Sequence, residues 1–297
     1  MLTRISPSTG KGSPEVVGFH DPETGSCQYL VIDPATRAAA LIDIVLDFDP
    51  VACRTSAASA EWALGLVEAH GADLRLILDT HPHADHLSAG DWLRGRTGAP
   101  LWSGAKVREI AALWEGFYNA PGMFDPDADF DRLLEDGETF RLGDLDVRVM
   151  LSPGHTLGSI SFVIGDAAFV HDTFMQPDSG TSRADFPGGS AAALHDSLMA
   201  ILALPDATRL FIGHDYGAAD RTEPSWESTV AEQRASNTHL GGGVSRDAFI
   251  ARRKARDATL KLPRRMLHAL QVNLRGGKLP AAESNGQSFF KLPANLF

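Results

Sequence analysis

Short apolar runs separated by turn-forming clusters open the chain. Three of them, at 16–19, 28–32 and 38–44, are divided by clusters containing Asp-Pro, and they predict an antiparallel meander. Apolar residues at helical spacing then cover 57–70 and stop at a glycine, which predicts a helix. The apolar run 74–78 predicts a buried strand that leads directly into a group of histidines.

The same order of elements recurs in the second half of the chain. Further strands are predicted at 139–142, 146–151, 159–164, 167–170 and 209–212, and further helices at 88–97, 190–203, 226–235 and 245–257. Residues 1–14 are expected to form a weakly tied arm, and 118–132 a long surface loop. The chain thus repeats one order of elements twice: a meander, a helix, a strand and a helix. This order favours two mixed sheets packed together with helices outside, a four-layer α/β arrangement.

Composition and charge exclude several classes of protein. The 297 residues are 43% hydrophobic and 22% charged, which is usual for a globular protein, and the net charge of −11 disfavours a nucleic-acid partner. No stretch has the length of a membrane span, and the N-terminus lacks the apolar core of a secretory leader. We therefore expect a cytoplasmic protein with no membrane partner. Its two cysteines, Cys27 and Cys53, are predicted to be small buried side chains rather than a disulfide.

Four potential metal ligands stand within six residues after the predicted strand 74–78: His81, His83, Asp85 and His86. Histidine and aspartate clustered in this way are typical of metal sites, and this donor set suits iron or zinc. Three more candidates follow other predicted strands: His155, Asp172 and His214. Because α/β proteins build sites from loops at strand ends, we expect these side chains to meet in one metal centre. His214 has an alternative role, in which it contacts the ligand side chains and does not bind the metal itself.

These segments resemble the metallo-β-lactamase superfamily over about residues 15–220. The matching motifs are Thr80-His81-Pro82-His83-Ala84-Asp85-His86, Pro153-Gly154-His155-Thr156, Asp172 and Gly213-His214-Asp215. The resemblance implies an αββα sandwich, with a catalytic domain over 1–240 and a C-terminal extension over 241–297 packed on the same domain. In dinuclear members the matching positions would place His81, His83 and His155 on one metal, Asp85, His86 and His214 on the other, and Asp172 between them.

Within this superfamily the chain is most similar to the persulfide dioxygenases, on the segments 83–90, 158–162, 180–189 and 270–277. That resemblance implies one Fe(II) held by His81, His155 and Asp172, with glutathione persulfide and O₂ as substrates. Asp85, His86 and His214 would then be catalytic residues beside the metal, and His83 a further candidate ligand.

The resemblance also implies substrate contacts. Arg183 matches an arginine that helps to hold glutathione, although a surface ion pair is its alternative role. Tyr216 and Thr156 are expected to face the substrate. Two positions depart from the family pattern, namely His171 before Asp172, where glycine is common, and Ala184, where bacterial relatives often have cysteine.

Other functions remain open. A hydrolase with one or two zinc ions, for which glyoxalase II is the nearest case, is compatible with the seven filled positions. The segment 180–189 fits the dioxygenase better, and the tail lacks the basic, aromatic appendage of glyoxalase II. A non-catalytic protein on this fold should have lost ligands, and none is lost.

The tail carries two further expectations. It is short and has no cysteine, so we expect no fused sulfurtransferase domain. Its apolar side chains need cover, which predicts either a homodimer or packing on the parent domain; they are Phe289, Phe290, Leu292, Leu296 and Phe297.

Overall fold

The computed structural model describes residues 1–297, and its strands form two large sheets and a small one. The first sheet has, in spatial order, β1 (Leu2–Ser6), β2 (Glu15–His20), β3 (Cys27–Ile32), β4 (Ala38–Ile42), β7 (Asp73–Leu78), β9 (Leu101–Gly104) and β10 (Arg132–Leu134). The second has β11 (Thr139–Leu142), β12 (Leu145–Leu151), β13 (Ile160–Ile164), β14 (Ala167–His171), β15 (Arg209–Ile212) and β16 (Glu227–Thr229). The small sheet has β6 (Arg54–Ser56), β5 (Val45–Asp49) and β8 (Leu87–Ser88).

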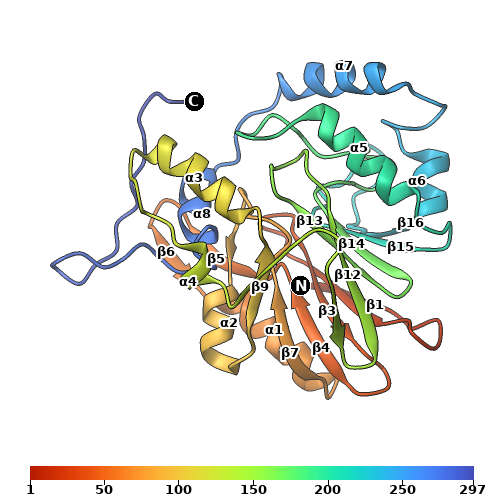
Figure 1. Cartoon of the computed structure of the whole chain (residues 1–297), viewed down its shortest axis with the longest axis horizontal. Coiled ribbons are helices and arrows are strands. Elements are labelled where there is room, and N and C mark those ends of the chain that lie inside the picture. The colour runs from red at the N-terminus through yellow and green to blue at the C-terminus, as the bar shows by residue number, and fades with distance from the viewer.

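Eight helices accompany these sheets. They are α1 (Ala58–Ala69), α2 (Gly90–Thr97), α3 (Val107–Tyr118), α4 (Pro126–Asp129), α5 (Ala191–Leu202), α6 (Val230–Ser236), α7 (Arg246–Asp257) and α8 (Met266–Asn273). Figure 1 shows α5, α6 and α7 beside the second sheet, with the other helices gathered on the side of the first. None of the eight has the length and apolarity that crossing a membrane requires.

Successive side chains of the first sheet enter two different hydrophobic cores. In β3, Tyr29 and Val31 face the core shared with the second sheet and α5, whereas Leu30 and Ile32 face the core under α1, α2, α3 and α8. This alternation follows from the pleat of a strand, which points neighbouring side chains to opposite faces. Both faces of the first sheet are therefore covered, and the predicted αββα sandwich is confirmed.

The predicted repetition of elements is also confirmed. In the first half, β2, β3 and β4 are antiparallel neighbours, and β7 returns after α1 to lie parallel to β4. In the second half, β12, β13 and β14 are antiparallel, and β15 returns after α5 to lie parallel to β14. Each half thus ends in a pair of parallel strands whose following loops emerge at the same sheet edge.

Some expected elements are wrong. Within the N-terminal arm predicted over 1–14, residues Leu2–Ser6 form β1, which pairs with β2. A short edge strand with mostly exposed side chains carries little apolar patterning, so β1 could not be recognised from the sequence. The segment 118–132, expected to be a loop, contains the one-turn helix α4 and two buried phenylalanines, Phe124 and Phe130.

Two further expectations need correction. The helix predicted over 226–235 begins as the strand β16 and becomes α6 only at Val230, where Thr229 and Glu232 form a capping box. Cys27 is buried as predicted, but Cys53 is exposed, and neither forms a disulfide. Cys53 lies in the turn between β5 and β6 with a positive φ of 49°, a conformation typical of surface turns.

The chain after residue 240 packs against both cores. Phe249 of α7 belongs to the core of the second sheet, whereas Met266 and Leu270 of α8 belong to the other. The ring of Phe290 lies 5.6 Å from that of Phe48, and that of Phe297 lies 5.5 Å from that of Phe117. About half of the surface remains exposed for four apolar side chains of the tail, so the homodimer stays a prediction; they are Phe289, Leu292, Leu296 and Phe297.

Candidate metal centre

Four strand ends bring the candidate ligands together. The loop after β7 carries His81, His83, Asp85 and His86, and the loops after β12, β14 and β15 carry His155, Asp172 and His214. All seven side chains are buried except that of Asp85, which is 18% exposed. The repeated parallel pairs explain this convergence, because their loops leave the two packed sheets at a common edge.

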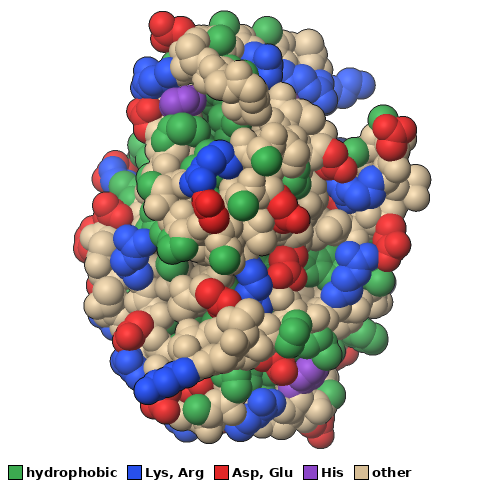
Figure 2. All heavy atoms as spheres, turned by 90° about the vertical axis from the view of Figure 1, so that its right-hand side faces the viewer, with side chains coloured by type: hydrophobic (Ala, Val, Ile, Leu, Met, Phe, Trp, Pro, Cys, Tyr) green, Lys and Arg blue, Asp and Glu red, His purple; other side chains and the backbone are tan.

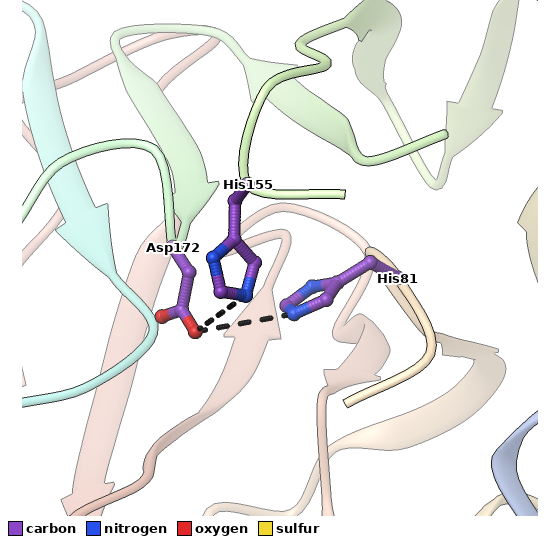
Figure 3. A group of neighbouring side chains, drawn as sticks. All are labelled: His81, His155 and Asp172. Atoms are coloured by element: carbon purple, nitrogen blue, oxygen red, sulfur yellow. Dashed lines mark ion pairs between the residues drawn. The ribbon is translucent and has the colours of Figure 1, made fainter. Parts of the chain in front are cut away.

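His81, His155 and Asp172 form a compact group of possible ligands (Figure 3). The Asp172 Oδ2 atom lies 3.4 Å from His155 Nε2 and 3.9 Å from His81 Nε2. Ligand atoms bound to one metal at about 2.1 Å lie roughly 3 to 3.5 Å apart, so a small contraction would complete the geometry. Two imidazoles and one carboxylate on one face leave the remaining positions of a metal open.

The outer ring nitrogens fix the orientation of both imidazoles. His155 Nδ1 donates to the Arg183 carbonyl oxygen at 2.9 Å, and His81 Nδ1 lies 3.0 Å from the Thr80 hydroxyl. His81 Nε2 is buried and has no hydrogen-bond partner, although buried polar atoms normally have one. Burial and the neighbouring His83 and His171 rings lower the pKa of His81 well below its usual value. A neutral imidazole with an unsatisfied Nε2 is what a metal ion requires, so these residues fit a bound metal.

His214 lies between two carboxylates. Its Nδ1 is 2.6 Å from Asp172 Oδ1 and its Nε2 is 2.6 Å from Asp85 Oδ2. Burial alone would lower the pKa of His214, but these two carboxylates raise it well above its usual value. The Ser26 hydroxyl lies 3.1 Å from the same Nε2. Both nitrogens of His214 are therefore engaged by protein groups, and the ring orients Asp172 and Asp85.

A second group of possible ligands contains His83, Asp85 and His86. His86 Nδ1 lies 3.1 Å from Asp85 Oδ2, and its Nε2 is buried without a partner. His83 Nε2 instead lies 3.1 Å from the buried Asp43 carboxylate. Burial would raise the pKa of Asp43, but His83 and the Thr80 hydrogen bonds lower it. The structure thus groups His83 with Asp85 and His86, with its ring 4.1 Å from that of His81 and its Nε2 beside Asp43.

A cavity of about 660 Å³ opens above the first group. Its floor contains His155, Asp172, Asp85 and His214, and its wall includes the apolar side chains Phe186 and Met175. Tyr216 stands at the mouth, 67% exposed, with its ring stacked on His214 at 5.6 Å. Thr156 does not line the cavity, since its hydroxyl is bonded to that of Ser159 at 2.6 Å.

The wall formed by residues 253–265 is strongly basic. Arg256, Lys261 and Arg264 line the cavity, and none of them forms an ion pair; we call these three side chains the cationic rim. The acidic lining residues Glu23 and Asp178 are already paired with Arg265 and Arg221. Figure 2 shows charges of both signs interspersed over the face that it draws.

Arg183 lines the cavity, but its guanidinium is already engaged. It binds both oxygens of Asp185, at 2.6 and 2.8 Å, and donates to the Lys261 carbonyl at 2.7 Å. The structure therefore places Arg183 in an ion pair, which was the alternative to a substrate contact. Its position ties the loop after β14 to the segment that carries the cationic rim.

Several residues of the site were missed from the sequence. Ser26 and Asp43 each contact the ligand groups from the first meander, and Asn273 contacts the His83 and His86 carbonyls from α8. A single serine, aspartate or asparagine far from the motifs has no spacing to mark it. His171 could be noticed in the sequence, because glycine is common at its position in the family that the chain resembles. The structure gives the reason: His171 has a φ of 39°, in the left-handed region that favours glycine.

The comparisons with known proteins support this geometry. The Metallo-beta-lactamase superfamily model matches residues 25–214. A Beta-lactamase hydrolase-like protein of Xylella fastidiosa is 53% identical over 95% of this chain, which corresponds to 65% of that protein's length. Glyoxylase B2 of Dictyostelium discoideum is 39% identical over 93% of the chain and 96% of that protein. The mitochondrial Persulfide dioxygenase ETHE1 of Bos taurus is 30% identical over 92% of the chain and 93% of that protein.

Among solved structures, the crystal structure of ETHE1 from Myxococcus xanthus superposes with a TM-score of 0.70 at 28% identity. The match covers 94% of this chain and all of that one. The family match spans all of the His and Asp loops up to His214. The chain therefore belongs to the metallo-beta-lactamase superfamily, within which it is related to the ETHE1 proteins.

Proposed function

We propose that this chain is a persulfide dioxygenase, which oxidises glutathione persulfide with O₂ at one Fe(II). The observation that carries the proposal is the group of His81, His155 and Asp172. Two imidazoles and one carboxylate with open positions are the donor set of non-haem Fe(II) oxygenases. His214, which a dinuclear site would place on the second metal, has both nitrogens engaged by carboxylates, and this favours a single metal.

The reaction converts the persulfide, O₂ and water into glutathione and sulfite. Bound by these three residues, Fe(II) would supply the place where O₂ and the terminal persulfide sulfur meet. Around it, His214 holds Asp172 in position, and the Arg183 carbonyl fixes the tautomer of His155. Phe186 and Met175 give the cavity an apolar wall beside the metal group, which limits access of water.

The cationic rim supports an anionic substrate. Glutathione persulfide carries two carboxylates at a distance from its reactive sulfur, so one end can approach the metal group while the other meets the rim. Arg256, Lys261 and Arg264 have no carboxylate of their own to neutralise, whereas Arg183 has Asp185. We therefore assign the substrate carboxylates to the rim, with Arg183 supporting its position through the Lys261 carbonyl.

A metal-dependent hydrolase is the second candidate. The group of His83, Asp85 and His86 favours it, because a second metal there would give the paired arrangement that activates water. Relatives with hydrolase-like and glyoxylase names point the same way. The same cationic rim would then bind the glutathione part of a thioester.

One experiment separates the two candidates. Protein loaded anaerobically with Fe(II) is given glutathione persulfide in an oxygen electrode, and sulfite is measured. O₂ uptake with one sulfite per O₂ supports the dioxygenase, and a His155→Ala protein should show none. If Fe-loaded protein takes up no O₂ while zinc-loaded protein hydrolyses S-lactoylglutathione, the proposal fails and the hydrolase replaces it.

A further inference from the structure

Helix α8 ends against the loop that carries the His and Asp cluster. Its last residue, Asn273, is only 2% exposed. The amide nitrogen donates to the carbonyl oxygens of His83 and His86, both at 2.8 Å. The amide oxygen accepts from the Ser88 backbone N–H at 2.7 Å. One side chain from the C-terminal part of the chain thus connects three peptide groups of this loop.

The loop has little other support from the backbone. Residues 81–86 take part in no backbone–backbone hydrogen bond, whereas Thr80 before them and Ala89 after them do. Buried peptide groups without partners are costly, so the bonds from Asn273 satisfy carbonyls that the loop itself leaves open. The same bonds restrict the positions of the adjoining side chains.

The turn after α8 is fitted equally closely to the same region. A Cβ atom on Gly277, whose φ is +94°, would lie 2.7 Å from the Ser88 carbonyl oxygen and 3.1 Å from the Gly90 nitrogen. Only glycine allows this backbone approach. Helix α8 itself is anchored on its far side, where the Tyr118 hydroxyl donates to the Leu267 carbonyl at 2.9 Å. Asn273 is therefore held in place from two directions.

We infer that Asn273 is a positioning residue for the metal centre: it acts through the loop backbone to place His83, Asp85 and His86, and with them His81 at the start of the loop. The C-terminal segment thereby takes part in metal binding without supplying a ligand. The inference holds for a dioxygenase and for a hydrolase alike, because it concerns metal binding and not the substrate.

The test uses full-length protein carrying Asn273→Ser, which shortens the side chain, and Asn273→Asp, which keeps its shape and its acceptor but removes both donors. Affinity for Co(II) is measured by competition with a chelator, and ligand geometry by the visible absorption of the Co(II) protein. We expect both variants to bind Co(II) at least about tenfold more weakly, as when other groups that orient ligands are lost, and the absorption bands to change.

Gln271→Ala is the matched control. Gln271 is a fully buried amide of the same helix, but it bonds the Leu267 and Lys291 backbone and so holds the tail rather than the loop. It should lower the unfolding midpoint while leaving Co(II) affinity and spectrum unchanged. Wild-type Co(II) affinity in both Asn273 variants, or an equal loss in Gln271→Ala, would overturn the inference. So would failure of both Asn273 variants to fold, since the residue would then act on stability alone.

Discussion

Hydrogen-bond partners separate the roles of chemically identical side chains in this site. His155 uses Nδ1 on a backbone carbonyl and turns Nε2 towards Asp172 and His81, whereas His214 uses both nitrogens on carboxylates. The same holds for the arginines of the cavity, where Arg183 is paired with Asp185 and Arg264 has no carboxylate partner. Residue type and spacing locate such a site, but the partners decide what each side chain can do.

Substitution of His155 should remove the metal without removing the fold. We expect His155→Ala protein to purify with little metal and to lose activity by more than about a hundredfold, since a ligand matters at least as much as the groups that orient it. Metal content by mass spectrometry and circular dichroism check the two statements. His195→Ala is the control, because His195 lies on α5 outside the cavity. A His155→Ala protein with full metal content and activity would contradict the site.

The candidate site residues could be predicted from the sequence because each follows an apolar strand. His81, His155, Asp172 and His214 all do so, and the structure brings their side chains together. The neighbour of His83 could not be predicted, because Asp43 follows β4, and β4 lies beside β7 only in the folded sheet. Contacts of this kind depend on strand order, which apolar patterning does not specify.

At the scale of elements, the turn that carries His155 depends on a close approach to α5. Gly154 has a φ of +134°, and a Cβ atom there would lie 2.3 Å from backbone atoms of Leu194. Gly65 of α1 is the opposite case, since it is exposed in the helix and a Cβ atom would meet nothing within 4 Å.

The two glycines give opposite predictions. Gly154→Ala should destabilise the protein by about 1–3 kcal/mol and lower its metal content, because the turn must move away from α5. Gly65→Ala should stabilise it by about 0.5–1 kcal/mol, since alanine suits a helix interior better, and should leave metal content unchanged. Urea unfolding checks both values. A neutral Gly154→Ala variant would show that the turn adapts more easily than its packing indicates.

The last turn of α7 and the segment that follows it yield a prediction about substrate affinity. Replacing Arg256, Lys261 and Arg264 together with glutamine should raise KM for glutathione persulfide about tenfold with little change in kcat, because each exposed pair contributes about 0.5 kcal/mol. The increase should shrink at high salt. Arg246→Gln is the control, because Arg246 stands at the start of α7 and is paired with Asp196 outside the cavity. An unchanged KM would exclude the rim as the anion site.

Most elements with strong periodicity were predicted, whereas short or polar ones were not. Helix α3 is an exception, because its buried residues recur at the helical period and it was still missed. The meanders and α1, α5 and α7 have apolar positions at the strand or helix period. The edge strand β1 has mostly exposed side chains, and β16 has three residues, too few to show a period. Helix α8 was missed although most of it is buried, because the buried residues include the polar Gln271 and Asn273, which interrupt the apolar pattern.

At the scale of the whole molecule, the metal centre joins the two sheets. His81 follows a strand of the first sheet, and His155 and Asp172 follow strands of the second. A metal bound to all three would cross-link the halves of the sandwich, and its binding free energy would add to the stability of the fold.

Removal of metal should therefore lower the thermal stability. Metal at a hundred times its Kd stabilises the folded state by about 2.7 kcal/mol, which corresponds to an increase in Tm of about 5 °C for a chain of this size. Calorimetry of chelator-treated and reloaded protein measures the difference. The His155→Ala protein should show no increase on reloading. An equal increase in that variant would mean that the metal stabilises the fold from another site.

The cavity takes its floor and its cationic wall from separate stretches of chain: the floor from strand ends before residue 215, the wall from 253–265. Selection can therefore act on the two independently. Substitutions in the wall would change which anion the cavity binds and would leave the metal centre intact. Homologues could therefore acquire new substrates by exchanging a dozen residues. Asn273 follows that stretch in the sequence, and its side chain bonds the loop that carries the candidate ligands. An exchange of the wall that displaced Asn273 would therefore also disturb the metal centre.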